Sequence, residues 1–102
     1  MTEHDFDSQI RSLISLYGWM GYRTWISIHS PKGFVDWFCV RGDRLVALEL
    51  KGDKGKLTDD QVICLELLRL TRKIETYALW PEDSDLAVSI LRADTHDEIE
   101  EA

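Results

Sequence analysis

The dipeptide Gly42-Asp43 is the feature that most constrains how this chain can fold. It lies between two runs rich in Val, Leu, Phe and Trp. Glycine at the first position of a two-residue loop favours a type II′ turn, which joins two antiparallel strands. We therefore predict a hairpin in which Arg41 pairs with Arg44 beside the turn, and this register fixes every other pair along the two strands.

The predicted register brings three charged side chains together. It sets Asp36 directly opposite Glu49, with Cβ atoms roughly 5 Å apart, and strand alternation puts Lys51 on the same face as Glu49. Two carboxylates at that distance repel each other, and a hard divalent cation bound by oxygen ligands would remove the repulsion. We interpret the group as a metal site with a lysine beside it. The alternative is an exposed cross-strand salt bridge, worth at most about 1 kcal/mol.

Three segments carry a family pattern. They are Gly33-Phe34-Val35-Asp36, Glu49-Leu50-Lys51, and Gly55-Lys56-Leu57-Thr58 followed by Gln61. In this order they resemble the PD-(D/E)xK nucleases, most closely the small VRR-NUC domains often carried by bacteriophages, and the resemblance runs from about Glu3 to Leu91. It implies an α/β fold of the restriction-endonuclease-like type, an αβββαβ(α) core with a small mixed central sheet flanked by helices. Residues 1–93 would form this single nuclease domain, and residues 94–102 an acidic C-terminal tail.

The resemblance also implies the parts of an active site. The metal would be Mg²⁺, with Mn²⁺ able to replace it, and its ligands would be Asp36, Glu49, Glu3 and the backbone carbonyl of Leu50. Lys51 would orient the attacking water or stabilise the charge that builds up on the phosphate. Gln61 would position that water or Lys51. Contacts to nucleic acid are predicted for Lys32, Lys54, Lys56, Ser27 and His29.

This chain departs from the family pattern at three places. Val35 stands where a proline is usual, which alters the start of the strand rather than a ligand. Arg23 stands where a histidine is common. Leu79-Trp80-Pro81 stands where Trp-Arg-Pro is usual, which removes one possible phosphate contact.

Several of the site residues also have purely structural interpretations. Thr2 can cap the first helix, and an acid such as Glu3 in its first turn is favoured by the helix dipole. Thr58 and Gln61 have the spacing of a capping box, in which each side chain bonds to the backbone of the other residue. The lysines and the histidine of the loops can equally be solvated side chains.

Hydrophobic periodicity and stop signals predict five elements besides the hairpin. They are a helix over 5–17 ended by Gly18, a strand over 22–28, a helix from Thr58 to about 72, a strand over 74–80 ended by Pro81, and a helix over 82–91. In the second helix we expect Ile63, Leu67 and Leu70 to be strongly buried. The residues after Asp94 are expected to be a frayed, solvated tail.

The net charge of -7 argues against a nucleic-acid partner until its distribution is considered. Five acids and no base lie in the last nine residues, so residues 1–93 carry 12 basic and 14 acidic groups. Between residues 32 and 56 bases outnumber acids, and we expect a basic rim formed by Lys32, Arg41, Arg44, Lys51, Lys54 and Lys56. Such a rim is compatible with DNA.

Cysteine usage and hydropathy suggest a cytoplasmic protein, in the host cytoplasm if the chain is phage-encoded. Cys39 and Cys64 are too few for a zinc site or a disulfide framework, and reduced buried thiols are typical of the cytosol. A signal peptide and an apolar run of about 18 residues are both absent, so secretion and membrane spanning are not expected.

The predicted function is Mg²⁺-dependent endonucleolytic hydrolysis of DNA phosphodiester bonds, in the processing of phage or mobile-element DNA. A domain of 102 residues presents little surface to grip a duplex. We therefore expect a homodimer that acts on branched or structured DNA, such as a four-way (Holliday) junction or a flap. The alternative function is a non-catalytic nuclease-fold module that binds DNA or a protein. A small-molecule phosphohydrolase would need a closed pocket, which so short a domain is poorly placed to form.

Overall fold

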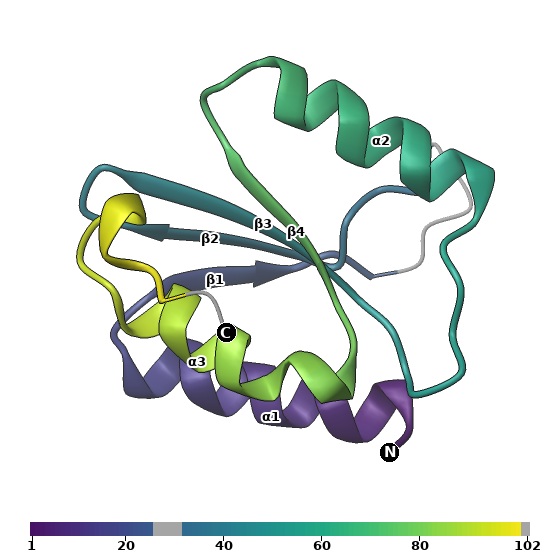
Figure 1. Ribbon diagram of the computed structural model, residues 1–102, viewed down its shortest axis with the longest axis horizontal. Helices are drawn as coiled ribbons and strands as arrows, with labels where there is room; N and C mark the ends of the chain where they lie inside the picture. Colours follow the sequence, from purple (N-terminus) through teal and green to yellow (C-terminus); the bar gives the residue numbers. More distant parts are fainter. Residues whose placement is uncertain (26–31, 101–102) are drawn as a thin grey trace.

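The computed structural model describes residues 1–25 and 32–100, and its centre is a four-stranded mixed sheet (Figure 1). The sheet order is β1-β2-β3-β4, antiparallel except for the parallel pair of β3 and β4. The strands are β1 (Met20–Arg23), β2 (Trp37–Arg41), β3 (Arg44–Leu50) and β4 (Glu75–Leu79). The helices are α1 (Glu3–Leu16), α2 (Asp59–Leu70) and α3 (Ser84–Arg92), with 3₁₀ turns η1 (Pro81–Asp83) and η2 (His96–Glu98).

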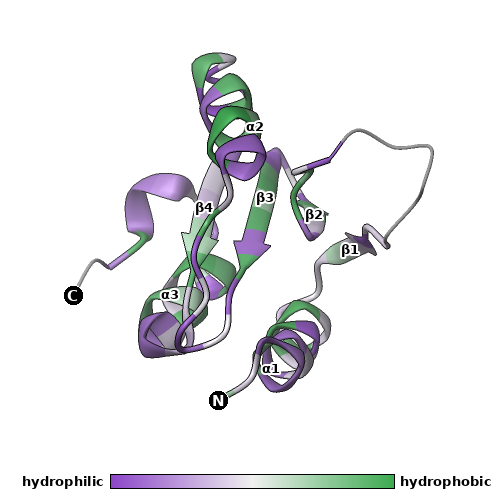
Figure 2. Ribbon diagram, turned by 90° about the vertical axis from the view of Figure 1, so that its right-hand side faces the viewer, coloured by the Kyte–Doolittle hydropathy of each residue, from purple (hydrophilic) through white to green (hydrophobic). Residues whose placement is uncertain are grey.

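The helices cover the two faces of the sheet unequally. α1 and α3 lie side by side on one face, and α2 lies alone on the other (Figures 1 and 2). The order helix, three strands, helix, strand, helix is the predicted one, and the mixed α/β class with a sheet between helices is confirmed. Among the described residues, no helix is long and apolar enough to cross a membrane.

The predicted hairpin is confirmed, and so is its register within the ladder, but the predicted pair of Asp36 and Glu49 lies beyond the last paired residues. Arg41 pairs with Arg44, and the ladder runs in the same register to the pair of Trp37 and Leu48. Gly42 has φ +60°, a value that a side chain would strain, as the first position of a type II′ turn requires. Asp36 lies one residue before β2, and its backbone N–H donates to the Leu48 carbonyl at 2.9 Å.

The first helix and strand both begin earlier than expected. α1 starts at Glu3 because the Thr2 side chain accepts a hydrogen bond from the Asp5 N–H at 3.1 Å, and Gly18 ends it at φ +75°. β1 ends at Arg23, whose partner Trp37 is the first residue of β2. Thr24 and Trp25 follow the strand without a regular structure, and Ser27, in the rest of the predicted strand, and the loop residue His29 lie outside the described residues.

The prediction that α2 is strongly buried is wrong. Among the described residues, the apolar cluster on its face of the sheet has three buried members, Val35, Ala47 and Leu65, whereas the apolar cluster on the α1 and α3 face has thirteen. α2 turns Leu65, with Cys64 and Leu68 at its edges, toward the sheet. The side with Ile63, Leu67 and Leu70 is exposed, because no second helix covers it in the part of the chain that the structure describes.

Residues 94–98 are exposed, as expected, but the described part of the predicted tail is not frayed. It forms the 3₁₀ turn η2, and Ile99 packs against the core beneath α3. The Glu100 N–H then donates to the Ser89 hydroxyl at 2.7 Å. These contacts fold the acidic segment back onto the domain instead of leaving it in solvent.

Candidate active site

Asp36 and Glu49 lie together where β3 approaches its end. The Glu49 carboxylate is only 3% exposed, and its Oε1 lies 3.8 Å from Lys51 Nζ. Asp36 Oδ2 accepts a hydrogen bond from the Leu50 N–H at 2.8 Å, which holds this carboxylate against the backbone between Glu49 and Lys51. The sequence-predicted group of two carboxylates and a lysine is therefore present on one face of the sheet.

One atom of this group has no partner. Glu49 Oε2 is buried and accepts no hydrogen bond from any described residue. Burial, reinforced by the neighbouring Asp36 charge and opposed by Lys51, raises the pKa of Glu49 to about 8. A buried acceptor without a donor is rare in folded proteins and calls for an ion, a water molecule or a proton. A hard cation with oxygen ligands fits this pair of carboxylates. It would favour the ionised form of Glu49 and would also give Oε2 a partner.

Glu3 is close to this pair but is not brought into it. Its negative charge contributes to the raised pKa of Glu49, yet its side chain is exposed in the first turn of α1. Gly52 holds that turn against the loop after β3, because a Cβ there would lie 2.9 Å from the Glu3 nitrogen. Within residues 1–25 and 32–100 no cluster of three or more Asp, Glu, His or Cys side chains is arranged to hold a metal ion. The role of Glu3 as a ligand remains a prediction.

Gln61 forms the predicted capping box and also contacts the candidate site, through Glu49 rather than through Lys51. Its Oε1 accepts from the Thr58 N–H at 2.9 Å, and its own N–H donates to the Thr58 hydroxyl at 3.2 Å, which completes the capping box of α2. Its Nε2 donates to Glu49 Oε1 at 2.8 Å. The start of α2 is thereby tied to the site carboxylate.

Asp7 is a residue that the sequence interpretation missed. Its Oδ1 accepts from Arg23 Nε at 2.8 Å and from Trp37 Nε1 at 2.9 Å, and Arg23 Nη1 lies 3.4 Å from Asp36 Oδ1. Arg23, at the position where the family pattern has a histidine, thus links α1 to the Asp36 carboxylate. The spacing in the sequence could have indicated Asp7. It lies four residues after Glu3, which puts both acids on one face of the first helix.

The predicted basic rim is only partly present. Lys32, Lys54 and Lys56 are exposed on loops that lead to or from the site residues, as expected of contacts to phosphate. Arg41 and Arg44 lie at the hairpin end of the sheet, where their guanidinium groups are fully engaged with the protein. The prediction is wrong for these two arginines.

The engagement of each arginine is specific. Arg44 makes two hydrogen bonds to the Glu75 carboxylate, at 2.8 and 2.7 Å, and a third to the Ile90 carbonyl at 2.9 Å. Arg41 donates to the carbonyls of Tyr17 and Leu91, each at 2.9 Å. These hydrogen bonds use the two guanidinium groups within the fold instead of presenting them as part of an exposed basic rim.

Comparison with known proteins leaves the family resemblance as a prediction. No family model, no curated protein and no solved structure matches this chain.

Proposed function

We propose that this protein is a Mg²⁺-dependent DNA endonuclease of the PD-(D/E)xK type, with a restriction-endonuclease-like fold. The observation that carries the proposal is the buried, unpartnered Glu49 Oε2 beside Asp36 and Lys51. An ordinary salt bridge between strands would be exposed and would leave no carboxylate oxygen unsatisfied.

The metal would be held by Asp36, Glu49 and the Leu50 carbonyl, with Glu3 as a further ligand. When bound, Mg²⁺ would polarise the phosphate and lower the pKa of the attacking water. The order of elements observed here is also the order expected of this nuclease fold.

The protein's own groups would supply charge and orientation. Lys51 is nearly buried, so its ammonium charge acts in a region of low dielectric on a phosphate placed beside the two carboxylates. The Gln61 amide fixes the rotamer of Glu49 through their 2.8 Å hydrogen bond. Trp80 donates from Nε1 to the Gly55 carbonyl at 2.7 Å, which fixes the loop that carries Lys54 and Lys56 beside the site. These lysines would bind phosphates outside the scissile bond.

The test is cleavage of labelled linear, flap and four-way-junction DNA with Mg²⁺ or Mn²⁺. We expect metal-dependent cutting, strongest on a branched substrate, and its loss in Lys51→Ala and Asp36→Asn. Arg92→Ala is the matched control, since this exposed arginine ends α3, on the opposite face of the sheet from α2 and Gln61 (Figure 1).

The alternative is a non-catalytic module that binds DNA or a protein. It is favoured by the absence, among the described residues, of a third acidic side chain beside Asp36 and Glu49. DNA binding without cutting of any substrate would support this alternative and refute the nuclease. A protein that neither cuts nor binds DNA would refute both nucleic-acid functions.

A further inference from the structure

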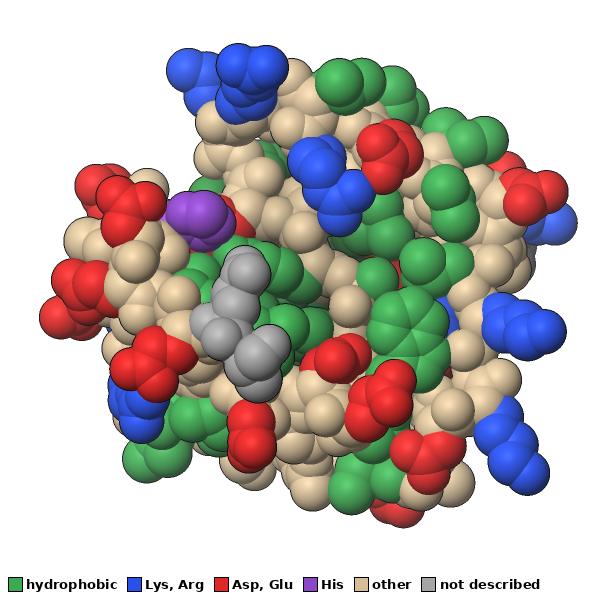
Figure 3. Space-filling model, viewed as in Figure 1, with side chains coloured by type: hydrophobic (Ala, Val, Ile, Leu, Met, Phe, Trp, Pro, Cys, Tyr) green, Lys and Arg blue, Asp and Glu red, His purple; other side chains and the backbone are tan. Residues whose placement is uncertain are grey.

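The outer side of α2 carries an apolar stripe that no other element of residues 1–25 and 32–100 covers. Its members Val62, Ile63, Leu67 and Leu70 are 43%, 56%, 62% and 75% exposed. The spacing of Ile63, Leu67 and Leu70 places them on one side of a helix. Hydrophobic side chains gather along the edge of the molecule formed by α2 (Figure 3). We call these four residues the α2 stripe.

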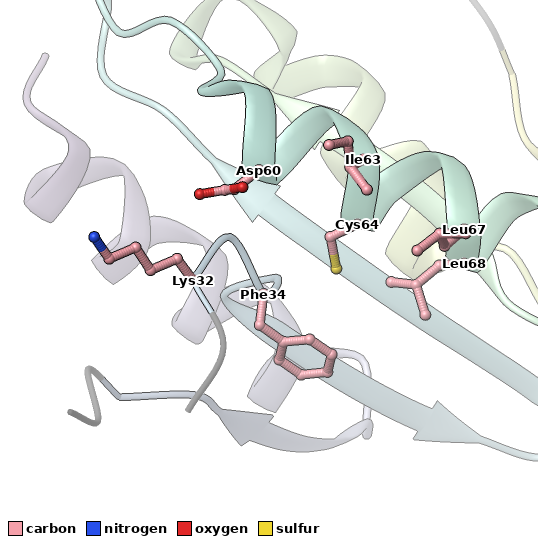
Figure 4. A pocket seen from close by; sticks show the side chains of 7 residues that line it. All are labelled: Lys32, Phe34, Asp60, Ile63, Cys64, Leu67 and Leu68. Carbon is pink, nitrogen blue, oxygen red and sulfur yellow. The ribbon is translucent and has the colours of Figure 1, made fainter. Parts of the chain in front are cut away.

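An open groove of about 380 Å³ extends the α2 stripe toward the loop before β2. Ile63 and Leu67 line its helix side, and Phe34, which is 47% exposed, lies on the opposite side (Figure 4). A contiguous apolar surface of this kind on a small domain marks an interaction site, whereas single exposed apolar residues need no explanation.

The charges at the two ends of α2 indicate which partner fits the stripe. The helix begins with two acids, Asp59 and Asp60, and its end is followed by Arg72 and Lys73. A second copy of α2 laid antiparallel would place the acidic start of each helix beside the basic end of the other. The two helix dipoles would also oppose each other favourably. A parallel arrangement would bring like charges together at both ends.

The charged residue within the stripe does not prevent this pairing. Glu66 lies among the apolar members, and its Oε1 forms an ion pair of 2.7 Å with Arg69 Nη1 of the same helix. The surface therefore carries one ion pair, neutralised within its own helix, among its apolar residues, and it is self-complementary in charge at its ends. Self-complementarity under a two-fold rotation is the property of an isologous dimer interface.

We propose that the α2 stripe is the interface of a homodimer in which two copies of α2 pack antiparallel. This assignment names the contact surface and does not depend on the nuclease function. α2 has 12 residues and so spans about 18 Å at 1.5 Å per residue. Because Gln61 is in its first turn, the dimer would hold its two candidate sites at opposite ends of the helix pair. If the proposed function is correct, this spacing lets one dimer act on two strands of a branched DNA.

The test measures molar mass by light scattering and sedimentation over a concentration series, without metal or DNA. We expect a dimer for the native chain and a folded monomer for Leu67→Glu. Leu16→Glu is the matched control, because Leu16 is 71% exposed on α1 and lies outside the interface. Circular dichroism checks that both variants are folded.

A charge-reversal pair then tests the antiparallel arrangement. Asp59→Lys should weaken the dimer at least tenfold, and adding Lys73→Asp in the same chain should restore it. A native chain that is monomeric at hundreds of micromolar, including one that binds a different protein through α2, would overturn the proposal. So would a dimer that Leu67→Glu leaves intact. A monomer that still cuts DNA would remove the dimer and leave the proposed nuclease standing.

Discussion

The side chain of Gln61 donates from Nε2 to Glu49 Oε1 at 2.8 Å, while its Oε1 accepts from the Thr58 N–H at 2.9 Å. One amide thus caps α2 and fixes a carboxylate of the candidate active site. Any displacement at the start of α2 is transmitted to Glu49 through a single side chain.

Substitutions at Thr58 and Gln61 should separate capping from chemistry. Thr58→Ala removes the capping hydroxyl and should lower the free energy of unfolding by about 1 kcal/mol, without reducing cleavage by the folded protein. Gln61→Ala removes both bonds, so it should lose similar stability and also reduce cleavage about tenfold or more. Urea denaturation and single-turnover cleavage measure the two quantities. Equal cleavage rates for the two variants would show that Gln61 acts only as part of the helix cap.

The raised pKa of Glu49 predicts a stability that falls as pH rises. Below the ordinary value of 4.5 this residue is protonated in both the folded and the unfolded states. Between that value and about 8 the unfolded state loses the proton while the folded state keeps it, so the free energy of unfolding falls. The fall should level off at higher pH and amount to roughly a few kcal/mol.

Glu49→Gln should remove that dependence. In urea denaturation with a chelator present, the variant should match the native chain in acid and be more stable than it above the raised pKa. The difference between the two proteins isolates Glu49 from the other titrating groups. Parallel pH profiles for the two would show that Glu49 titrates normally in the folded protein.

Mg²⁺ should raise the melting temperature, and more strongly in mild alkali than in mild acid. A cation that binds the ionised form of Glu49 must displace its proton, so the apparent affinity rises with pH until the raised pKa is passed. Asp36→Asn should abolish the shift, whereas Glu66→Gln, which removes an exposed acid of α2, should keep it. A shift that persists in Asp36→Asn would place the cation elsewhere.

Arg44 should be essential for the stability of the fold and should contribute nothing to DNA affinity. Its side chain is 4% exposed and makes two hydrogen bonds to Glu75. Burial raises the pKa of Glu75, but the bonds from Arg44 and Tyr77 outweigh it and hold the pKa below its usual value. Arg44→Met leaves that largely buried acid without its cation, with the Tyr77 hydroxyl as its remaining hydrogen-bond donor, so it should cost about 3 kcal/mol.

The double variant Arg44→Met, Glu75→Met should recover most of that loss, because neither buried charge then remains. DNA affinity of the folded double variant should equal that of the native chain, whereas Lys54→Ala should weaken binding. Chemical denaturation and a binding titration at fixed salt measure both effects. A weaker DNA affinity in the double variant would show that Arg44 contributes to DNA binding.

The sequence alone determined the local parts of this protein. The Gly42-Asp43 turn fixes the hairpin register, since glycine accepts the positive φ that the turn requires and side chains alternate along strands. That register carries Asp36 to the end of β3 that holds Glu49 and Lys51, where the Leu50 N–H binds its carboxylate. Caps at Thr2 and Thr58 were equally predictable, because each bond spans only three residues.

Only the tertiary structure decided which surfaces are covered and where the long cationic side chains are placed. Periodicity shows that Ile63, Leu67 and Leu70 share one side of α2, but it does not say whether another element packs there. The same limit applies to Arg44, whose partner Glu75 is 31 residues away, and to Arg23 between Asp7 and Asp36. Burial and ion pairing depend on contacts between segments that are distant in the chain. A local sequence pattern does not specify such contacts.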